Sequence, residues 1–417
     1  MPPPILEYLT LGYQLVWNQL RQPVAVQLFV DPIGPQAVDA AHLLAAIGQS
    51  WSEQSPRLIL CVQAPSLLQG LLQHCAPGGP CLAVQEEQLA DAALAARVHA
   101  AHQRGVQLLW CGAPGQQPAD DMASCFSRSV LSLTAAQALL CLRASLRWHQ
   151  DDSMTPPGRR HSPALAGQVY EAVASRILAE HCLDEQDAWG VAGWPTEDVL
   201  HGYRGRQIQS AHRTVVRLVE AIDADASTET IEHALAEEPV LTYRFLRYAN
   251  SAALGLRTCV DSLRHALMVL GLATFRHWLL EQLPHAGSDL NLQPVRSAMV
   301  VRARLMELLL DAGEEDQLRS EVYLCGLLSQ IDLVLGEPLA NALQRLPLSE
   351  RIADAVLRNS GPYAPFLEVA SALEYPAQHA VAHLCATHQL DLGDVNRVLL
   401  RVLAHAQPHP PKGRLLD

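Results

Sequence analysis

The chain has 417 residues, of which 49% are hydrophobic and 5% are aromatic, and its formal net charge is −13. A chain of this length is too long for a single hydrophobic core, so we expect two domains of roughly 200 residues. The low aromatic content implies aliphatic cores, which favour helix. The acidic balance argues against general binding to nucleic acid, because phosphate contacts need a basic surface. Ten cysteines without a Cys-x-x-Cys pair, and no apolar run of about eighteen residues, predict a cytoplasmic protein that does not bind membranes.

The first half of the chain alternates short apolar runs with helical segments. A first strand is expected within 5–17, and buried parallel strands are expected at 24–30, 58–62, 81–84, 106–111 and 127–133. Apolar residues at helical spacing predict helices at 35–47, 66–74, 89–103 and 134–148, and a partly helical segment at 164–182. Strand alternating with helix is typical of an α/β domain, which we place at 1–195.

The second half is nearly all helix. We expect a connecting helix at 196–222, an all-α helical domain at 223–407 and a disordered tail at 408–417. Pro239 suits the first turn of a helix that ends at Asn250 and Ser251, and Ser262 is a good N-cap for the next helix, whose apolar stripe closes on Gly271. Further helices are expected at 228–236, 295–312, 320–335, 348–359, 365–375, 377–388 and 391–406.

Three motifs in this helical half occur in a fixed order. They are Glu-Pro-x-Leu at 238–241, Leu-Arg-x-x-Asn-Ser at 246–251, and Ser-x-x-x-Ala-x-x-x-Leu-Gly at 262–271. The set closely resembles the HDOD family, the output domains related to HD phosphohydrolases. The resemblance implies a helical bundle that serves as a regulatory module.

The first half resembles the EAL family, a TIM-type barrel with cyclic di-GMP phosphodiesterase activity that is a common partner of HDOD domains. The segment 12–18 is similar to the opening Gly-Tyr-Glu-x-Leu-x-Arg of that family, and 190–200 is similar to the segment where such barrels hand over to HDOD. The resemblance therefore implies a two-domain EAL–HDOD protein. Because 113–195 is short for a full set of closing strands, a degenerate barrel with missing or distorted elements is one expected outcome.

The EAL resemblance also implies that the catalytic residues have been lost. Two divalent cations with hard anionic ligands would have to stabilise the attacking and leaving oxygens of the phosphodiester. The positions that match the family's ligands and neighbouring motif residues carry other residue types instead: Gln14, Asn18, Gln85, Gln88, Cys111, Gly112 and Gly167. A slip in the alignment would bring Glu86 or Glu87 near a ligand position. The family's lysine cannot be supplied by such a slip, since the sole lysine is Lys412 in the tail.

The metal site of HD phosphohydrolases is expected to be missing as well. The segment 326–331 resembles the pattern Gly-Leu-Leu-His-Asp-Ile, with Ser329 and Gln330 in place of the His and the Asp. Neither side chain is a convincing metal ligand. We therefore predict no catalytic residue, no bound metal and no cofactor.

A candidate interaction surface lies around the HDOD motifs. It comprises the arginines and the polar corner of the two helices, Arg244, Arg247, Asn250, Ser251, Arg264 and Arg276. One reading is a basic docking face for an acidic partner or a nucleotide phosphate. The other is a solvated helix surface, with Asn250 and Ser251 satisfying backbone groups at the helix junction.

The function that these patterns favour is a non-enzymatic bacterial signalling scaffold that acts through a protein partner. Two alternatives remain open at this point. The barrel could bind cyclic di-GMP as a sensor without cleaving it, or either half could be a metal-dependent phosphohydrolase.

Overall fold

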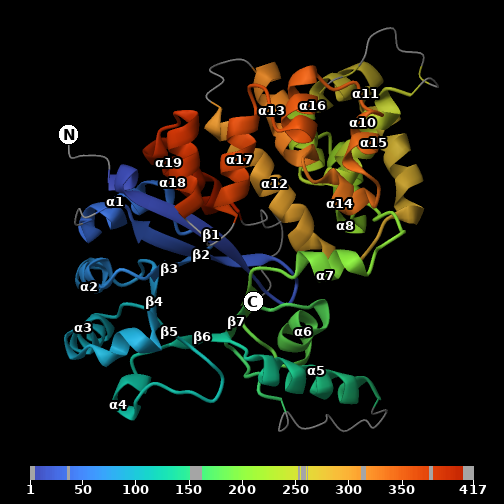
Figure 1. Cartoon of the computed structure of the whole chain (residues 1–417). Helices are drawn as coiled ribbons and strands as arrows, with labels where there is room; N and C mark the ends of the chain where they lie inside the picture. The colour runs from blue at the N-terminus through green and yellow to red at the C-terminus, as the bar shows by residue number, and fades with distance from the viewer. Residues whose placement is uncertain are drawn as a thin grey trace. The chain divides into compact units, whose positions relative to one another are not determined.

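The computed structural model describes residues 5–34, 38–150, 162–251, 254, 260, 262–310, 316–374 and 379–406 (Figure 1). The chain divides into two compact units. Unit 1 contains Met1–Pro195 together with Ala372–Asp417, and unit 2 contains Thr196–Ser371. The expected disordered tail at 408–417 lies outside the described residues. Among the helices of the described ranges, none is long and apolar enough to cross a membrane.

Unit 1 is built on a closed barrel of eight strands that follow one another in chain order. The strands are β1 Leu9–Trp17, β2 Pro23–Pro32, β3 Arg57–Val62, β4 Cys81–Gln85, β5 Leu108–Gly112, β6 Arg128–Ser132, β7 Val169–Glu171 and β8 Gly190–Ala192. Strand β1 is antiparallel to both β2 and β8, while the remaining pairs are parallel. The expected α/β barrel is confirmed. It lacks no strand, because β7 and β8 close it with only three residues each.

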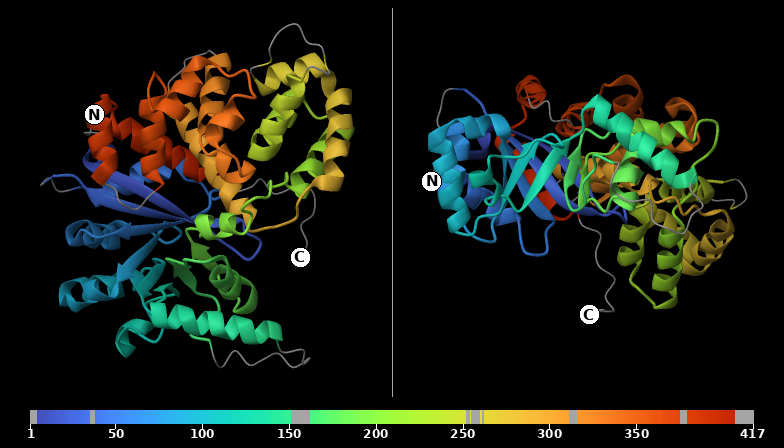
Figure 2. Two further views of the ribbon diagram at one scale, coloured as in Figure 1. Left: turned by 45° about the vertical axis from the view of Figure 1, so that its right-hand side comes forward. Right: turned by 90° about the horizontal axis from the view of Figure 1, so that it is seen from below.

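One short helix precedes the first strand of this barrel, and the other helices lie in the connections between strands. They are η1 Ile5–Tyr8, α1 Ala40–Ser50, α2 Pro65–His74, η2 Glu86–Ala90, α3 Ala92–Gln103, α4 Asp120–Ala123, α5 Ala135–Gln150, α6 Arg176–Glu180 and the π-helix η4 His181–Glu185. In Figures 1 and 2, α1, α2 and α3 follow one another along the outside of the strands. Helix α1 begins later than predicted because Asp39 caps it, accepting hydrogen bonds from the amides of Ala41 and His42. The segment 164–182, predicted to be partly helical, contains α6 and the start of η4, and it also contains β7, a strand that was not predicted.

Two helices from the end of the chain belong to unit 1. They are α18 His379–His388 and α19 Leu392–Ala404. Asn396 of α19 is fully buried, and its Nδ2 donates to the carbonyl oxygens of Leu6 and Leu9, both at 2.8 Å. This grouping differs from the expected continuous helical domain at 223–407. Helical periodicity identifies an apolar face but not the core that the face joins.

Unit 2 is helical and contains the segment with the HDOD motifs. Its helices are α7 Thr196–His201, α8 His212–Asp223, α9 Thr228–Ala236, α10 Pro239–Ala249, α11 Leu263–Gln282, η6 Leu283–His285, α12 Leu292–Leu309, α13 Asp316–Leu328, α14 Ile331–Leu335, α15 Leu339–Leu343 and α16 Glu350–Arg358, with α17 Ala364–Leu373 at the boundary. The single connecting helix expected at 196–222 is two helices, α7 and α8, and the helix expected at 320–335 is broken between α13 and α14. Helix α11 is capped by Ser262 as predicted, and it has a kink at Gly271 where the apolar stripe was expected to close.

Candidate functional site

The mouth of a barrel of this type is formed by the carboxyl ends of its parallel strands. Gln14 of β1 is half-buried and pairs in register with Gln27 of β2, and the Gln14 side chain lies beside Gly193. The Gln27 side chain is 3% exposed, and its Nε2 donates to the sulfur of Cys61 at 3.3 Å and to Glu171 Oε2 at 3.4 Å. These contacts place a cluster of mostly neutral polar groups in the barrel interior.

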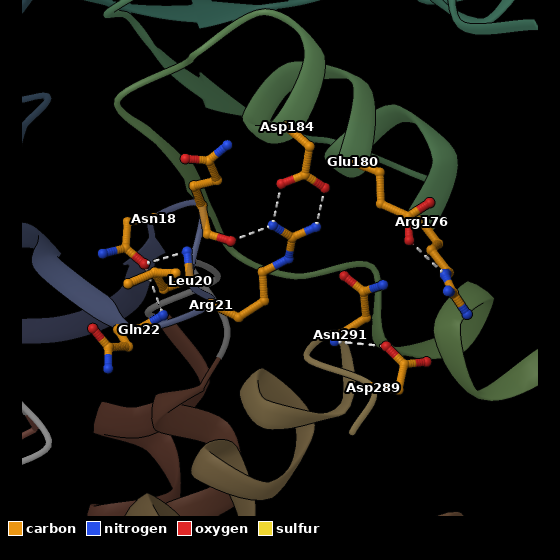
Figure 3. A network of polar contacts seen from close by, with 10 residues as sticks. Asn18, Leu20, Arg21, Gln22, Arg176, Glu180, Asp184, Asp289 and Asn291 are labelled. Atoms are coloured by element: carbon orange, nitrogen blue, oxygen red, sulfur yellow. Dashed lines mark hydrogen bonds and ion pairs between the residues drawn. The ribbon is translucent and has the colours of Figure 1, made fainter. Parts of the chain in front are cut away.

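Asn18 does not belong to this interior cluster. Its Oδ1 accepts from the amides of Leu20 at 3.0 Å and Gln22 at 2.9 Å, which fixes the turn between β1 and β2 (Figure 3). The same turn is anchored by Arg21, whose guanidinium forms two hydrogen bonds of 2.6 Å with Asp184 of η4. The position expected to match the family's arginine therefore stabilises a hairpin turn.

The two thiols at the barrel positions are held in their neutral form. Cys61 and Cys111 are 5% and 3% exposed and belong to the same interior core cluster. Burial raises the pKa of the Cys61 thiol to about 12, and burial raises the pKa of Cys111 well above its ordinary value. Because thiolates, and not thiols, act as nucleophiles and metal ligands, neither cysteine is suited to those roles at neutral pH.

Gln85 and Gln88 stabilise the start of η2. Gln88 Oε1 accepts from the Gln85 amide at 2.9 Å, and Gln88 Nε2 donates to the Val62 carbonyl at 3.0 Å. The reciprocal arrangement is a capping box. Glu86, which an alignment slip would bring into the site, accepts from Trp110 Nε1 at 2.6 Å, while Glu87 is exposed.

The two glycines among the candidate positions have backbone roles. At Gly112 a Cβ atom would lie 2.2 Å from the ring of Trp110, so a larger residue does not fit without rearrangement. Gly167 has a φ of +73° in the loop before β7, a conformation that favours glycine.

Glu171, at the end of β7, is the interior carboxylate that the sequence reasoning missed. Its Oε1 accepts from Ser132 Oγ at 2.5 Å, and its Oε2 receives the Gln27 contact described above. The resemblance to the EAL family matches the late glutamate of that family to Gly167, which lies before β7, whereas Glu171 lies at its end. A strand of three residues gives no periodic signal, so neither β7 nor the carboxylate at its end could be found from the pattern.

The residues at the barrel mouth do not fit a site for two divalent cations. Such a site needs several anionic oxygen ligands. Here one carboxylate, that of Glu171, is surrounded by amide, hydroxyl and neutral thiol groups. Within the part of the chain that the structure describes, no group of three or more His, Cys, Asp or Glu side chains could hold a metal ion.

An arginine lies against the two HD-like positions of unit 2. Ser329 and Gln330 fall in the break between α13 and α14, and Arg302 of α12 is 5% exposed. Its Nη1 donates to Ser329 Oγ at 3.3 Å, and with the Gln330 amide oxygen facing it, the guanidinium donates to that oxygen at 3.0 and 2.9 Å. The approach is close because Gly326 packs against the backbone of Ala303. The Arg302 guanidinium therefore puts a positive charge at the positions where a metal ion would need anionic ligands.

Restoring the His-Asp pair is expected not to restore metal binding. In the double variant Ser329→His and Gln330→Asp, the new carboxylate would pair with the Arg302 guanidinium instead of a cation. Titration with Mn²⁺ by calorimetry should give no stoichiometric binding. Adding Arg302→Met to the double variant is the control, because it removes the competing cation. Stoichiometric Mn²⁺ binding by the double variant with Arg302 intact would contradict this interpretation.

The polar corner of the candidate interaction surface closes a loop. Asn250 Nδ2 donates to the carbonyl oxygens of Leu246 and Val260, both at 2.8 Å, and its Oδ1 accepts from the Val260 amide at 2.8 Å. Asn250 thus satisfies backbone groups at the helix junction, which is its role in the second of the two readings of this surface. Ser251 Oγ is buried and has no hydrogen-bond partner among the described residues.

Three of the four arginines of this surface are engaged within unit 2. Arg244 donates to Gln209 Oε1 at 3.0 Å and to the Ile208 carbonyl at 3.3 Å. Arg264 forms an exposed ion pair with Glu232 at 2.9 Å, and Arg276 forms one with Asp223 at 2.5 Å. Arg247 is exposed and forms no side-chain hydrogen bond or ion pair with the described part of the chain. The docking face stays a prediction, and Arg247 is the arginine whose charge is most available to a partner.

Comparison with known proteins agrees with the division into a barrel and a helical region. The model of the HDOD domain matches residues 208–351. The chain is 21% identical over 252 residues to the cyclic di-GMP phosphodiesterase CdgJ of Vibrio cholerae, which covers 58% of each chain. It is 28% identical over 151 residues to the uncharacterized protein YuxH of Bacillus subtilis, covering 35% of this chain and 36% of that protein. The matches thus span less than two thirds of either relative.

Two solved structures are also similar to parts of the chain. The response regulator MmoQ from Methylococcus capsulatus aligns with a TM-score of 0.38 at 20% identity, covering 47% of this chain and 98% of that one. The complex of Klebsiella pneumoniae BlrP1 with calcium and cyclic di-GMP aligns with a TM-score of 0.30 at 11% identity, covering 47% and 57%. The strand order of unit 1 and the match to the HDOD model show that the chain combines an eight-stranded barrel with a helical region that contains an HDOD domain.

Proposed function

We propose that this chain is a non-enzymatic signal-transduction regulator that acts through protein contacts. Its relationship to a cyclic di-GMP phosphodiesterase extends over 252 residues. The observation that carries the proposal is the use of the candidate catalytic positions for structural hydrogen bonds: Asn18 holds a turn, Gln85 and Gln88 hold a helix cap, and Arg302 holds Ser329 and Gln330.

The electrostatics of both candidate centres support this function. A phosphodiester displacement assisted by two metals needs anionic ligands that neutralise the cations and leave them free to polarise the phosphate. The barrel offers the Glu171 carboxylate among neutral groups, and the HD-like positions carry the positive charge of Arg302. Compared with a site of several carboxylates, both arrangements bind a divalent cation less favourably.

A second candidate is a sensor that binds cyclic di-GMP without hydrolysis. The buried Oε1 of Gln27 has no hydrogen-bond partner among the described residues, and Gln14 lies opposite it in the same pair of strands. A buried acceptor without a partner costs free energy that a ligand donor could recover. The guanine base of cyclic di-GMP carries such donors.

One set of measurements separates these functions. The full chain, incubated with cyclic di-GMP and Mg²⁺ or Mn²⁺, is expected to show no turnover above the protein-free blank. Calorimetry on the same preparation tests binding: heat that disappears in Gln27→Leu would favour the sensor over the scaffold. Turnover that is lost in Glu171→Gln and kept in Glu53→Gln, an exposed control, would overturn the non-enzymatic assignment.

A further inference from the structure

The end of the barrel opposite the mouth contains a small cavity of about 20 Å³. Its lining comes from the amino-terminal ends of the strands and the residues just before them: Arg57, Ile59, Cys81, Gln107, Leu109, Ser127, Arg128, Val169 and Trp189. Catalytic sites of barrel enzymes lie at the other end, so this cavity is separate from the candidate site. A water molecule needs about 10–15 Å³ of such space, so the cavity admits one small group and excludes a nucleotide.

Two arginines give this cavity a positive field. Arg57 begins β3 and Arg128 begins β6, strands that are not neighbours in the barrel. The Arg128 guanidinium lies over the Trp189 ring, 4.5 Å from its centroid. Of the described residues that line the cavity, none is acidic. Two positively charged side chains therefore line the same cavity, and no acidic side chain is among its lining residues.

The directions in which the pKa values of Arg128 and Cys81 shift agree with a positive field in the cavity. Burial lowers the pKa of Arg128, and the positive charge of Arg57 lowers it further. At Cys81, burial raises the pKa of the thiol while both arginines oppose that rise. The two guanidiniums thus act on the same thiol, and Cys81 can report on their charge. The Gln107 side chain, also in the lining, offers an amide donor in addition.

We propose that this cavity binds one small inorganic anion of about the size of chloride. The anion accepts hydrogen bonds from the guanidinium groups of Arg57 and Arg128 and offsets the repulsion between them. Because the two arginines belong to β3 and β6, the bound anion links opposite parts of the barrel wall. The bound anion stabilises the end of the barrel opposite the mouth, independently of the signalling function.

The test compares sodium chloride with sodium gluconate at equal ionic strength, since gluconate is too large for the cavity. Chloride is expected to raise the midpoint of thermal unfolding by roughly 2–4 °C. It should also slow alkylation of Cys81 by neutral N-ethylmaleimide roughly threefold, because an anion screens the arginines that favour the thiolate. Alkylation is followed on the Cys81 peptide by mass spectrometry.

Variants decide whether the effect belongs to this cavity. Arg57→Gln and Arg128→Gln should each remove the difference between chloride and gluconate. Arg97→Gln is the matched control, because Arg97 is an exposed arginine of the same unit that lies outside the cavity and should leave the difference intact. If Arg128→Gln does not fold, Arg57→Gln decides alone, since Arg57 is exposed at the start of its strand. Equal behaviour in the two salts, or a chloride effect that survives in Arg57→Gln, overturns the proposal.

Discussion

Replacing Arg296 by methionine is expected to destabilise unit 2 by about 3–5 kcal/mol, because it removes the guanidinium that contacts a buried carboxylate directly and leaves only the more distant charge of Arg244. Arg296 is 4% exposed and Glu238 is 1% exposed, and Arg296 Nε lies 2.9 Å from Glu238 Oε1. Arg296 also donates from Nη2 to the Gln209 carbonyl at 2.6 Å. Glu238 caps α10 by accepting from the Leu241 amide, and it accepts from the Ala211 amide at 3.1 Å. Glu238 thus joins the start of α10 to α12 and to the segment before α8.

Urea unfolding of the full chain, followed by circular dichroism, measures this loss. The matched control is Arg345→Met, which removes an exposed arginine from its pair with Glu337 at 2.8 Å. Exposed pairs contribute up to about 1 kcal/mol, so the control should unfold close to the unchanged chain. Equal midpoints for the two variants would show that the Glu238–Arg296 pair does not stabilise unit 2 through its burial.

The HDOD segment could be predicted from local chemistry because its main features are local. Pro239 occupies the first turn of α10, and Ser262 caps α11, as the residue types indicated. The role of Glu238 could not be predicted in full. Its cap of α10 follows from position, but its partner Arg296 lies on a helix distant in sequence, and only the tertiary fold brings the two charges together.

The barrel shows where periodicity is informative and where it fails. The strands from β2 to β6 were predicted because each contains a short apolar segment bounded by proline, glycine or polar residues. Strands β7 and β8 were missed because three residues carry no measurable alternation. Glu171 was missed with β7. The absence of metal ligands at the aligned positions was readable from residue types alone, but what Asn18 or Gln88 does instead depends on contacts that residue types do not encode.

Replacing Asn396 by alanine is expected to destabilise unit 1 by about 2–3 kcal/mol, because two buried backbone acceptors lose their donor. Asn396 is fully buried, and it is the residue of α19 that bonds the carbonyls of Leu6 and Leu9 at the start of the barrel. The effect should appear as a lower midpoint for the barrel, even though the residue lies near the end of the chain. A domain boundary that assigned α19 to the helical region would predict no such effect.

The adjacent Arg397 supplies the control for this experiment. Its side chain is 57% exposed and pairs with Asp394 on the same helix, so Arg397→Ala should change the free energy of unfolding by less than about 0.5 kcal/mol. Hydrogen exchange locates the change: Asn396→Ala should speed exchange of the β1 amides, while Arg397→Ala should not. If the exchange of β1 is the same in both variants, α19 does not stabilise the barrel through Asn396.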